Sequence, residues 1–161
     1  MKLYPVQTRI IKEGDSLVDA ILGGLKSQNL QVENKDVLAV TSKVVSYAER
    51  RVARLSEITP SKKAQELGTR YGINPKLAEL ILREADRIYG GVEKAVLTLK
   101  HNVLAPNAGV DAKNAPDDQV ILWPADPKRS AMDLRTEIGR RTDKKLAILI
   151  VDSGLAPLRI G

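Results

Sequence analysis

The hydrophobic and polar positions of the first third of the chain predict a strand, a helix and a second strand. Residues 3–11 alternate and are rich in Val, Ile and Thr, a pattern that is typical of a strand. Residues 17–26 follow the capping residue Ser16 and carry apolar side chains at helical spacing. Residues 37–46 form a β-branched run that predicts a mostly buried strand.

The rest of the chain mixes both kinds of element without strict alternation. Helices are expected to begin at Thr59-Pro60, at Asn74-Pro75 and at Asp126-Pro127, because each pair combines a capping residue with a proline at the first turn. We expect these helices to end near residue 72, at Gly90-Gly91 and near residue 141, respectively. Short strands are expected at residues 51–55, 92–100, 102–105, 120–123 and 146–151, with a long loop over residues 106–119. The pattern predicts an α+β fold, a mixed α/β sheet with flanking helices.

Composition narrows the possible functions. The 161 residues fit one domain, or a small two-lobed unit, and the absence of cysteine excludes disulfides, cysteine metal sites and thiol catalysis. With no Phe, one Trp and four Tyr, the chain lacks the exposed rings of base-stacking nucleic-acid modules. No apolar run reaches the length of a membrane span, and we expect a cytoplasmic protein with no membrane partner.

Charge is unevenly distributed around a net value of +6. Residues 101–127 form an acidic island with a local charge of −3, and residues 43–63 and 128–161 each carry +4. The island contains four aspartates: Asp111, Asp117, Asp118 and Asp126. The basic stretches around the acidic island indicate either an ordinary solvated surface or a site for a phosphorylated ligand, with carboxylates that hold a divalent cation.

Two segments carry candidate metal ligands. The block from Asn107 to Asp111 combines small residues, which allow close backbone approach, with oxygen donors, although the block taken alone favours a plain Asx turn. Asp152 and Ser153 directly follow an apolar strand, where ligands gather in open α/β sheets, although a turn or helix cap is the alternative. Asp111, Asp152 and Ser153 are therefore candidate ligands for Mg²⁺ or Mn²⁺.

A third segment carries candidate phosphate contacts. A lysine in the expected strand over residues 37–46 would lie at the strand end, face a ligand or snorkel to solvent. Ser42, Lys43 and Ser46 could meet phosphate charge with one ammonium and two hydroxyls. Neither a P-loop nor a dinucleotide-binding glycine motif occurs in the sequence. His101 is the single histidine, and a lone histidine is more often structural than catalytic.

Five blocks in this order resemble the coenzyme F420-0:L-glutamate ligase (gamma-glutamyl ligase) family over nearly the whole chain. They are residues 8–15, 42–49, 81–85, 107–111 and 151–153. The block Asn-Ala-Gly-Val-Asp at 107–111 is the most specific, followed by Ser-Lys-Val-Val-Ser at 42–46.

The resemblance implies a ligase that depends on GTP and a divalent metal. A γ-phosphoryl group would pass to the terminal carboxylate of F420-0, and the amine of L-glutamate would displace phosphate from the acyl phosphate. Asp111 and Asp152 match the metal aspartates, with Ser153 and Asn107 beside the site. Lys43, with Ser42 and Ser46, matches a nucleotide or substrate segment in which Lys43 would offset phosphate charge as the catalytic cation. The family also implies a homodimer or a complementing subunit.

The sequence departs from the family in its last segment. The family continues after the final strand with two aromatic residues and two arginines, whereas residues 152–159 keep only the aspartate, the proline and the last arginine. We therefore expect one ligase-like domain over residues 1–161 that lacks the C-terminal part of longer members. Three hypotheses remain: an active ligase, a non-catalytic or split-enzyme relative that binds a nucleotide or partner protein, and, last, a nucleic-acid binder.

Overall fold

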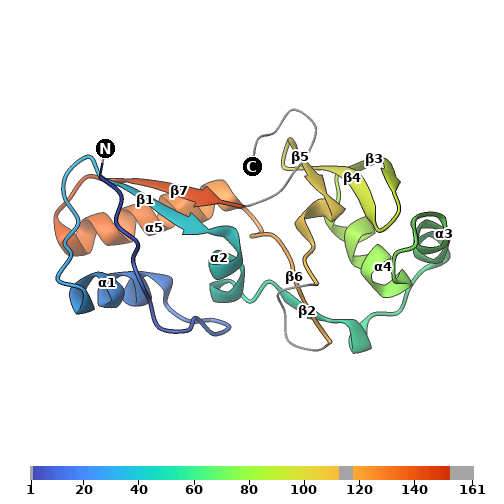
Figure 1. Cartoon of the computed structure of the whole chain (residues 1–161), viewed down its shortest axis with the longest axis horizontal. Coiled ribbons are helices and arrows are strands. Elements are labelled where there is room, and N and C mark those ends of the chain that lie inside the picture. Colours follow the sequence, from blue (N-terminus) through green and yellow to red (C-terminus); the bar gives the residue numbers. More distant parts are fainter. Residues whose placement is uncertain (1, 113–117, 153–161) are drawn as a thin grey trace. The chain divides into compact units, whose positions relative to one another are not determined.

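A computed structural model describes residues 2–112 and 118–152, and these divide into two compact units (Figure 1). Unit 1 consists of Met1–Arg51 and Pro124–Val151, and unit 2 consists of Val52–Trp123 and Asp152–Gly161. Ser153 is among the residues outside the description. The single ligase-like domain expected over residues 1–161 stays a prediction.

Unit 1 is built around one parallel strand pair. Figure 1 shows β1 and β7 side by side, with the long helix α5 running along them. The register joins Val37 to Ala147 and Thr41 to Val151. The elements of the unit are α1 (Leu17–Ser27), β1 (Val37–Thr41), α2 (Ser42–Ala48), α5 (Pro127–Thr142) and β7 (Ala147–Val151).

The helices of unit 1 cover one face of this strand pair. Buried apolar side chains from α1, α2 and α5 form one cluster with Val40 of β1, and Ile148 and Ile150 of β7 pack against it. On the opposite face, Val37 is 66% exposed and Leu149 is 53% exposed. The expectation of a mostly buried strand at residues 37–46 is therefore wrong for Val37, Ala39 and Thr41, which are exposed.

Two predicted strands of unit 1 need correction. The run at residues 37–46 is a strand only as far as Thr41, where its partner β7 also ends, and helix α2 begins at Ser42. Residues 3–11 form no strand, because they run over helix α1 rather than along another strand. The Gln7 carbonyl lies against Gly24, where a Cβ would approach it to 2.7 Å, and it also accepts a hydrogen bond from Gln28.

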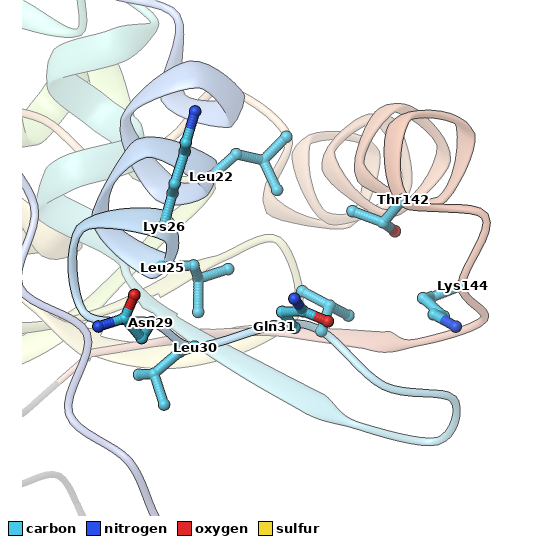
Figure 2. A pocket seen from close by; sticks show the side chains of 9 residues that line it. Leu22, Leu25, Lys26, Asn29, Leu30, Gln31, Thr142 and Lys144 are labelled. Carbon is cyan, nitrogen blue, oxygen red and sulfur yellow. The ribbon is translucent and has the colours of Figure 1, made fainter.

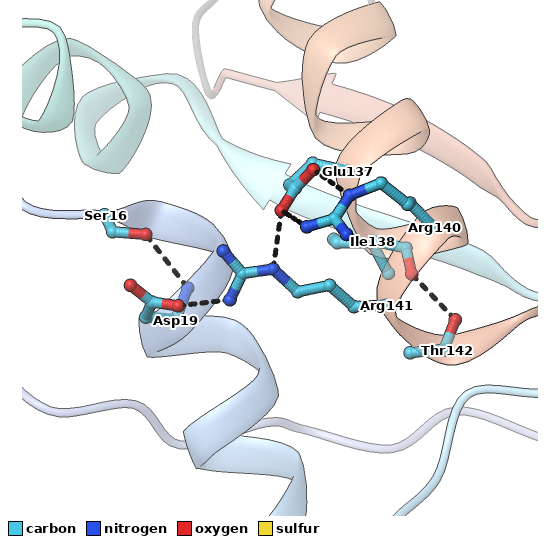
Figure 3. A network of polar contacts seen from close by, with 7 residues as sticks. All are labelled: Ser16, Asp19, Glu137, Ile138, Arg140, Arg141 and Thr142. Atoms are coloured by element: carbon cyan, nitrogen blue, oxygen red, sulfur yellow. Dashed lines mark hydrogen bonds and ion pairs between the residues drawn. The ribbon is translucent and has the colours of Figure 1, made fainter.

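An ion-pair network joins the C-terminal end of α5 to the N-terminal end of α1 (Figure 3). The Glu137 carboxylate accepts hydrogen bonds from Arg140 at 2.7 Å and 2.9 Å and from Arg141 at 2.6 Å. Arg141 also pairs with Asp19, which follows the N-cap Ser16. The Arg140 hydrogen bond, with that of Arg141, lowers the pKa of Glu137 to about 2.

Unit 2 combines two helices with antiparallel strands. The strands β3, β4 and β5 form a meander, and β2 pairs with β6. The helices α3 and α4 pack together over the meander, and their buried faces share one core with Val96 and Val120. The bounds are β2 (Val52–Arg54), η1 (Leu55–Glu57), α3 (Lys62–Tyr71), α4 (Pro75–Glu84), β3 (Arg87–Val92), β4 (Ala95–Lys100), β5 (Val103–Pro106), η2 (Asn107–Gly109) and β6 (Gln119–Ile121).

The predicted helix boundaries of unit 2 are partly wrong. Helix α3 begins after Ser61 rather than after Thr59, because the Ser61 hydroxyl accepts from the Ala64 N–H and the Glu79 carboxylate holds Ser61 in place. Helix α4 begins at Pro75 as predicted but ends at Glu84, not at Gly90-Gly91. The backbone beyond Glu84 leaves the helix because the Asp86 N–H donates to Leu99 and the β3–β4 ladder follows.

The α+β prediction is confirmed, since the two units contain helices together with parallel and antiparallel strand pairings. Within the part of the chain that the structure describes, no helix has the length and apolar character needed to cross a membrane.

Candidate functional site

The segment Asn107–Gly109 of unit 2 is a left-handed turn. Asn107, Ala108 and Gly109 have φ values of 52°, 54° and 72°. Left-handed backbone costs a non-glycine residue about 1–2 kcal/mol, so neighbouring contacts must hold this conformation. They come from β4: the Val96 N–H donates to Asn107 Oδ1 at 2.9 Å, and the Ala108 N–H donates to the Thr98 hydroxyl at 2.9 Å. Asn107 therefore has a turn-forming role in this structure.

Asp111 is fixed through its backbone. Its N–H donates to the Ile121 carbonyl at 2.8 Å, and its carbonyl accepts from the Ile121 N–H at 2.9 Å. The side chain of Asp111 is partly exposed, while Ile121 is buried in the end of β6. The pairing therefore anchors the backbone of Asp111 to the core of unit 2 and leaves its carboxylate near the surface.

Asp152 is held by Trp123, a residue that the sequence reasoning did not single out. The Trp123 Nε1–H donates to Asp152 Oδ2 at 2.8 Å. The indole ring of Trp123 also lies against Gly109, since a Cβ at that position would overlap the ring. The only signal in the sequence was a single tryptophan at the end of a predicted strand. Trp123 thus connects the left-handed turn to Asp152.

The acidic island contains two aspartates with structural tasks. Asp126 caps α5, because its side chain accepts from the Arg129 N–H at 2.9 Å. Asp118 accepts from the Ser56 N–H at 2.9 Å and from the Ser56 hydroxyl. Asp117 lies outside the described residues. Asp111 is the remaining described aspartate of the island.

The donor chemistry of unit 2 suits a hard divalent cation. Asp111 and Asp152 supply carboxylate oxygens, and Mg²⁺ or Mn²⁺ takes one or two such groups and fills its shell with water and phosphate oxygens. Among residues 2–112 and 118–152, no group of three or more His, Cys, Asp or Glu side chains is arranged to hold a metal. Asp111 and Asp152 could thus hold an ion whose remaining ligands are water and phosphate oxygens.

The predicted phosphate-contacting residues lie in unit 1, at the start of α2. Ser42 and Ser46 are buried, and the Ser46 hydroxyl donates to the Ser42 carbonyl at 2.9 Å. Lys43 lies on the same helix and is partly exposed. Lys43 was expected at a strand end, facing a ligand, or reaching to solvent. Its observed position is nearest to the strand end, because β1 stops at Thr41, two residues before Lys43. The roles of the three residues stay predictions.

Two of the blocks that carried the resemblance meet in unit 1. The Gly14 N–H donates to the Tyr47 carbonyl at 3.1 Å, and a Cβ at Gly14 would approach Arg50 Nε to 2.6 Å. Asp15 pairs with Arg9, and this hydrogen bond is the main cause that holds the pKa of Asp15 below its ordinary value. Residues 8–15 and 42–49 are therefore neighbours in space as well as being shared motifs.

The third of the five blocks, residues 81–85, contains one member of an ion pair within unit 2. Lys100, the last residue of β4, pairs with Glu84, the last residue of α4. The exposed fractions of their side chains are only 4% and 15%. His101 follows in the turn between β4 and β5, where its backbone N–H donates to Asp86 at 2.7 Å and its side chain is exposed.

A cavity in unit 1 was a second possible site (Figure 2). Its volume is about 410 Å³, and Lys26 and Lys144 lie at its rim. None of its lining residues, all within the described part of the chain, is acidic, so it does not suit a metal ion. It also adjoins the last turns of α1 and α5, whose carbonyl ends disfavour an anion. Its apolar lining comes from Leu22, Leu25, Leu30 and Val32.

Comparisons with known proteins identify relatives of the chain. It is 36% identical to the coenzyme F420:L-glutamate ligase of Methanopyrus kandleri over 163 residues, which cover 100% of the chain and 63% of that protein. The protein of the same name from Archaeoglobus fulgidus is 34% identical over 95% of the chain and 60% of its own length. The one from Methanosarcina mazei is 27% identical over 94% and 58%. The chain thus spans about three fifths of these relatives.

A family model confirms the resemblance seen in the sequence. The model described as F420-0:Gamma-glutamyl ligase matches residues 5–161, and this range includes all five blocks. The chain therefore belongs to the F420-0:gamma-glutamyl ligase family.

Proposed function

We propose that the chain takes part in the GTP-dependent addition of L-glutamate to the terminal carboxylate of coenzyme F420-0. The relatives from Methanopyrus kandleri and Archaeoglobus fulgidus, both named as F420:L-glutamate ligases, support the reaction class. The observation that carries the proposal is the connection of two carboxylate segments in unit 2, where Trp123 contacts Gly109 and binds Asp152.

The chemistry of the proposed reaction explains why a phosphoryl donor is needed. A carboxylate is a poor acyl donor, because oxide is a poor leaving group. Transfer of the γ-phosphoryl group to a carboxylate oxygen gives an acyl phosphate and GDP. The amine of L-glutamate then attacks the acyl carbon, phosphate leaves with that oxygen, and the amide forms with loss of one proton.

The residues of this chain would bind and orient the charged groups. Asp111 and Asp152 would hold Mg²⁺ or Mn²⁺, which supplies positive charge next to the phosphates, and Ser153 would assist. Lys43 would offset the charge of the transferred phosphoryl group, with Ser42 and Ser46 shaping its helix. The cytoplasmic location and the homodimer or complementing subunit that the resemblance implies stay predictions.

Metal binding by the full chain gives the first test. Titration with Mn²⁺, followed by the electron paramagnetic resonance signal of the free ion, should show binding by the wild type and its loss in Asp111→Asn and Asp152→Asn. Glu93→Gln is the matched control, because Glu93 is an exposed carboxylate in the same unit. Wild-type protein that binds no Mn²⁺ in the presence or absence of GTP would contradict the proposed metal site.

Activity gives the second test. Incubation of the chain with GTP, Mn²⁺, L-glutamate and F420-0 should yield GDP and a product heavier by one glutamyl unit, detected by mass spectrometry. Metal and GTP binding without product would instead support the non-catalytic or split-enzyme alternative.

A further inference from the structure

We propose that Trp123 is a positioning residue of the candidate metal site, whose indole N–H sets the orientation of the Asp152 carboxylate. The inference rests on the proposed function, because it assumes that Asp152 is a metal ligand. It adds a residue that lies outside the five blocks shared with the family.

The hydrogen bond itself is well suited to this task. An indole N–H can only donate, and an ionised carboxylate can only accept, so the two groups have one way to interact. The distance from Trp123 Nε1 to Asp152 Oδ2 is 2.8 Å, which is typical of a bond to a charged acceptor. Carboxylates that bind metals usually accept such a second hydrogen bond, which fixes their rotation and basicity.

The indole ring has little freedom to move away from this position. It lies against Gly109, and a side chain at Gly109 would overlap it. Gly109 also has a φ of 72°, so the position favours glycine for two independent reasons. Leu122 and Pro124, the chain neighbours of Trp123, are both buried. The indole N–H is therefore held in place by the buried residues that flank Trp123 in the chain and by the left-handed turn at Gly109.

One short segment consequently contacts both candidate ligand residues, Asp111 through its backbone and Asp152 through its carboxylate. Ile121 anchors the backbone of Asp111 by two hydrogen bonds of 2.8 Å and 2.9 Å. Trp123, two residues later, anchors the side chain of Asp152. We infer that the segment from Ile121 to Trp123 keeps unit 2 preorganised for a cation.

The test compares Mn²⁺ affinity between variants that remove the N–H and a variant that does not affect the site. In Trp123→Phe the hydrogen bond is lost and part of the ring contact remains. The benzothienyl analogue of tryptophan at position 123 replaces the N–H by sulfur and keeps the shape of the ring. The exposed Tyr89 provides the control variant Tyr89→Phe in the same unit.

We expect both changes at position 123 to weaken Mn²⁺ binding about 10-fold to 100-fold, with Tyr89→Phe unchanged. The analogue should retain the wild-type melting temperature by circular dichroism, since its packing is intact. Because Trp123 is the single tryptophan, wild-type fluorescence should also respond to added Mg²⁺. The Asp152→Asn variant should abolish this response.

The outcomes separate this inference from the proposed function. If the wild type binds Mn²⁺ and both variants at position 123 bind it equally well, the positioning role is wrong and the metal site stands. If Trp123→Phe weakens binding but the benzothienyl analogue does not, ring packing accounts for the effect and the role of the N–H is overturned. If the wild type binds no Mn²⁺, both inferences fail.

Discussion

The buried pair of Lys100 and Glu84 allows a quantitative prediction about the stability of unit 2. Their side chains are 4% and 15% exposed, so burial removes most of the hydration of each charge. The ion pair compensates for that loss. Removing one member of such a pair typically costs about 3–5 kcal/mol, because an uncompensated charge remains in a poorly solvated place. A natural domain has a total stability of roughly 5–15 kcal/mol, so a single substitution would remove a large part of it.

The two members should not be equivalent. Glu84→Gln leaves the more deeply buried ammonium without its carboxylate, and we expect a cost near the upper end, about 4–5 kcal/mol. Lys100→Met leaves a carboxylate that is closer to solvent, and we expect about 3 kcal/mol. The double variant Lys100→Met with Glu84→Leu removes both charges and should lose at most about 1 kcal/mol.

Urea unfolding followed by the fluorescence of Trp123 measures these costs in the same unit. The exposed Glu93 forms a 4.0 Å pair with Lys94, and the control Glu93→Gln should change stability by less than about 0.5 kcal/mol. The reasoning is refuted if either single variant costs less than about 1 kcal/mol, or if the double variant costs the sum of the two single variants.

Two further predictions concern a glycine and a surface carboxylate. Gly109→Ala should lower the free energy of unfolding in urea by about 1–3 kcal/mol, because its Cβ would overlap the Trp123 ring. The control Gly23→Ala lies in a helix with open space around it and should raise the free energy of unfolding by about 0.5–1 kcal/mol. Equal effects of the two substitutions would contradict the overlap. The pKa of Glu137, lowered to about 2 mainly by Arg140, means that its ion pairs stabilise the fold above about pH 4.5 and are lost as the pH falls towards 2. The melting temperature of Glu137→Gln should thus lie below that of the wild type at pH 7, and the difference should shrink steadily as the pH falls from about 4.5 towards 2. A difference that stays constant over this range would contradict the assignment.

Helix starts were predictable from the sequence where the chemistry is local. Ser16, Asn74 and Asp126 each cap the helix expected from the sequence, because a short polar side chain can satisfy free N–H groups without help from distant residues. Thr59 failed as a cap because Ser61 has an additional partner, Glu79, which is 18 residues away in the sequence. A capping motif therefore predicts a helix start best when no long-range contact competes.

The elements that sequence reasoning missed depend on partners far along the chain. Residues 42–46 belong to a β-branched run, yet they are helical, and β1 stops at Thr41, which pairs with Val151 at the end of β7. Residues 87–91 were predicted as the end of a helix, yet they belong to β3, because β4 pairs with them. Residues 3–11 alternate like a strand but have only helix α1 beside them. In each case the available partner decides the structure.

The two aspartates of the candidate site were predictable from the sequence, but the contacts that hold them were not. Asp111 and Asp152 were identified from their places after small residues and after an apolar strand, and both lie in unit 2. Trp123 was not identified, since the sequence places it only at the end of a predicted strand. Its role depends on contacts with Gly109 and Asp152, which are 14 and 29 residues away, respectively.

The division of the chain into units also divides the proposed function into two parts. The carboxylates and Trp123 belong to unit 2, and their contacts with Gly109 and Ile121 lie within that unit. Lys43 belongs to unit 1, with the segments around Gly14 and Tyr47. The proposed cation binding would require the residues of unit 2, and the proposed role of Lys43 would require those of unit 1. Mn²⁺ titration therefore tests the first requirement alone, and only ligation of glutamate tests the second.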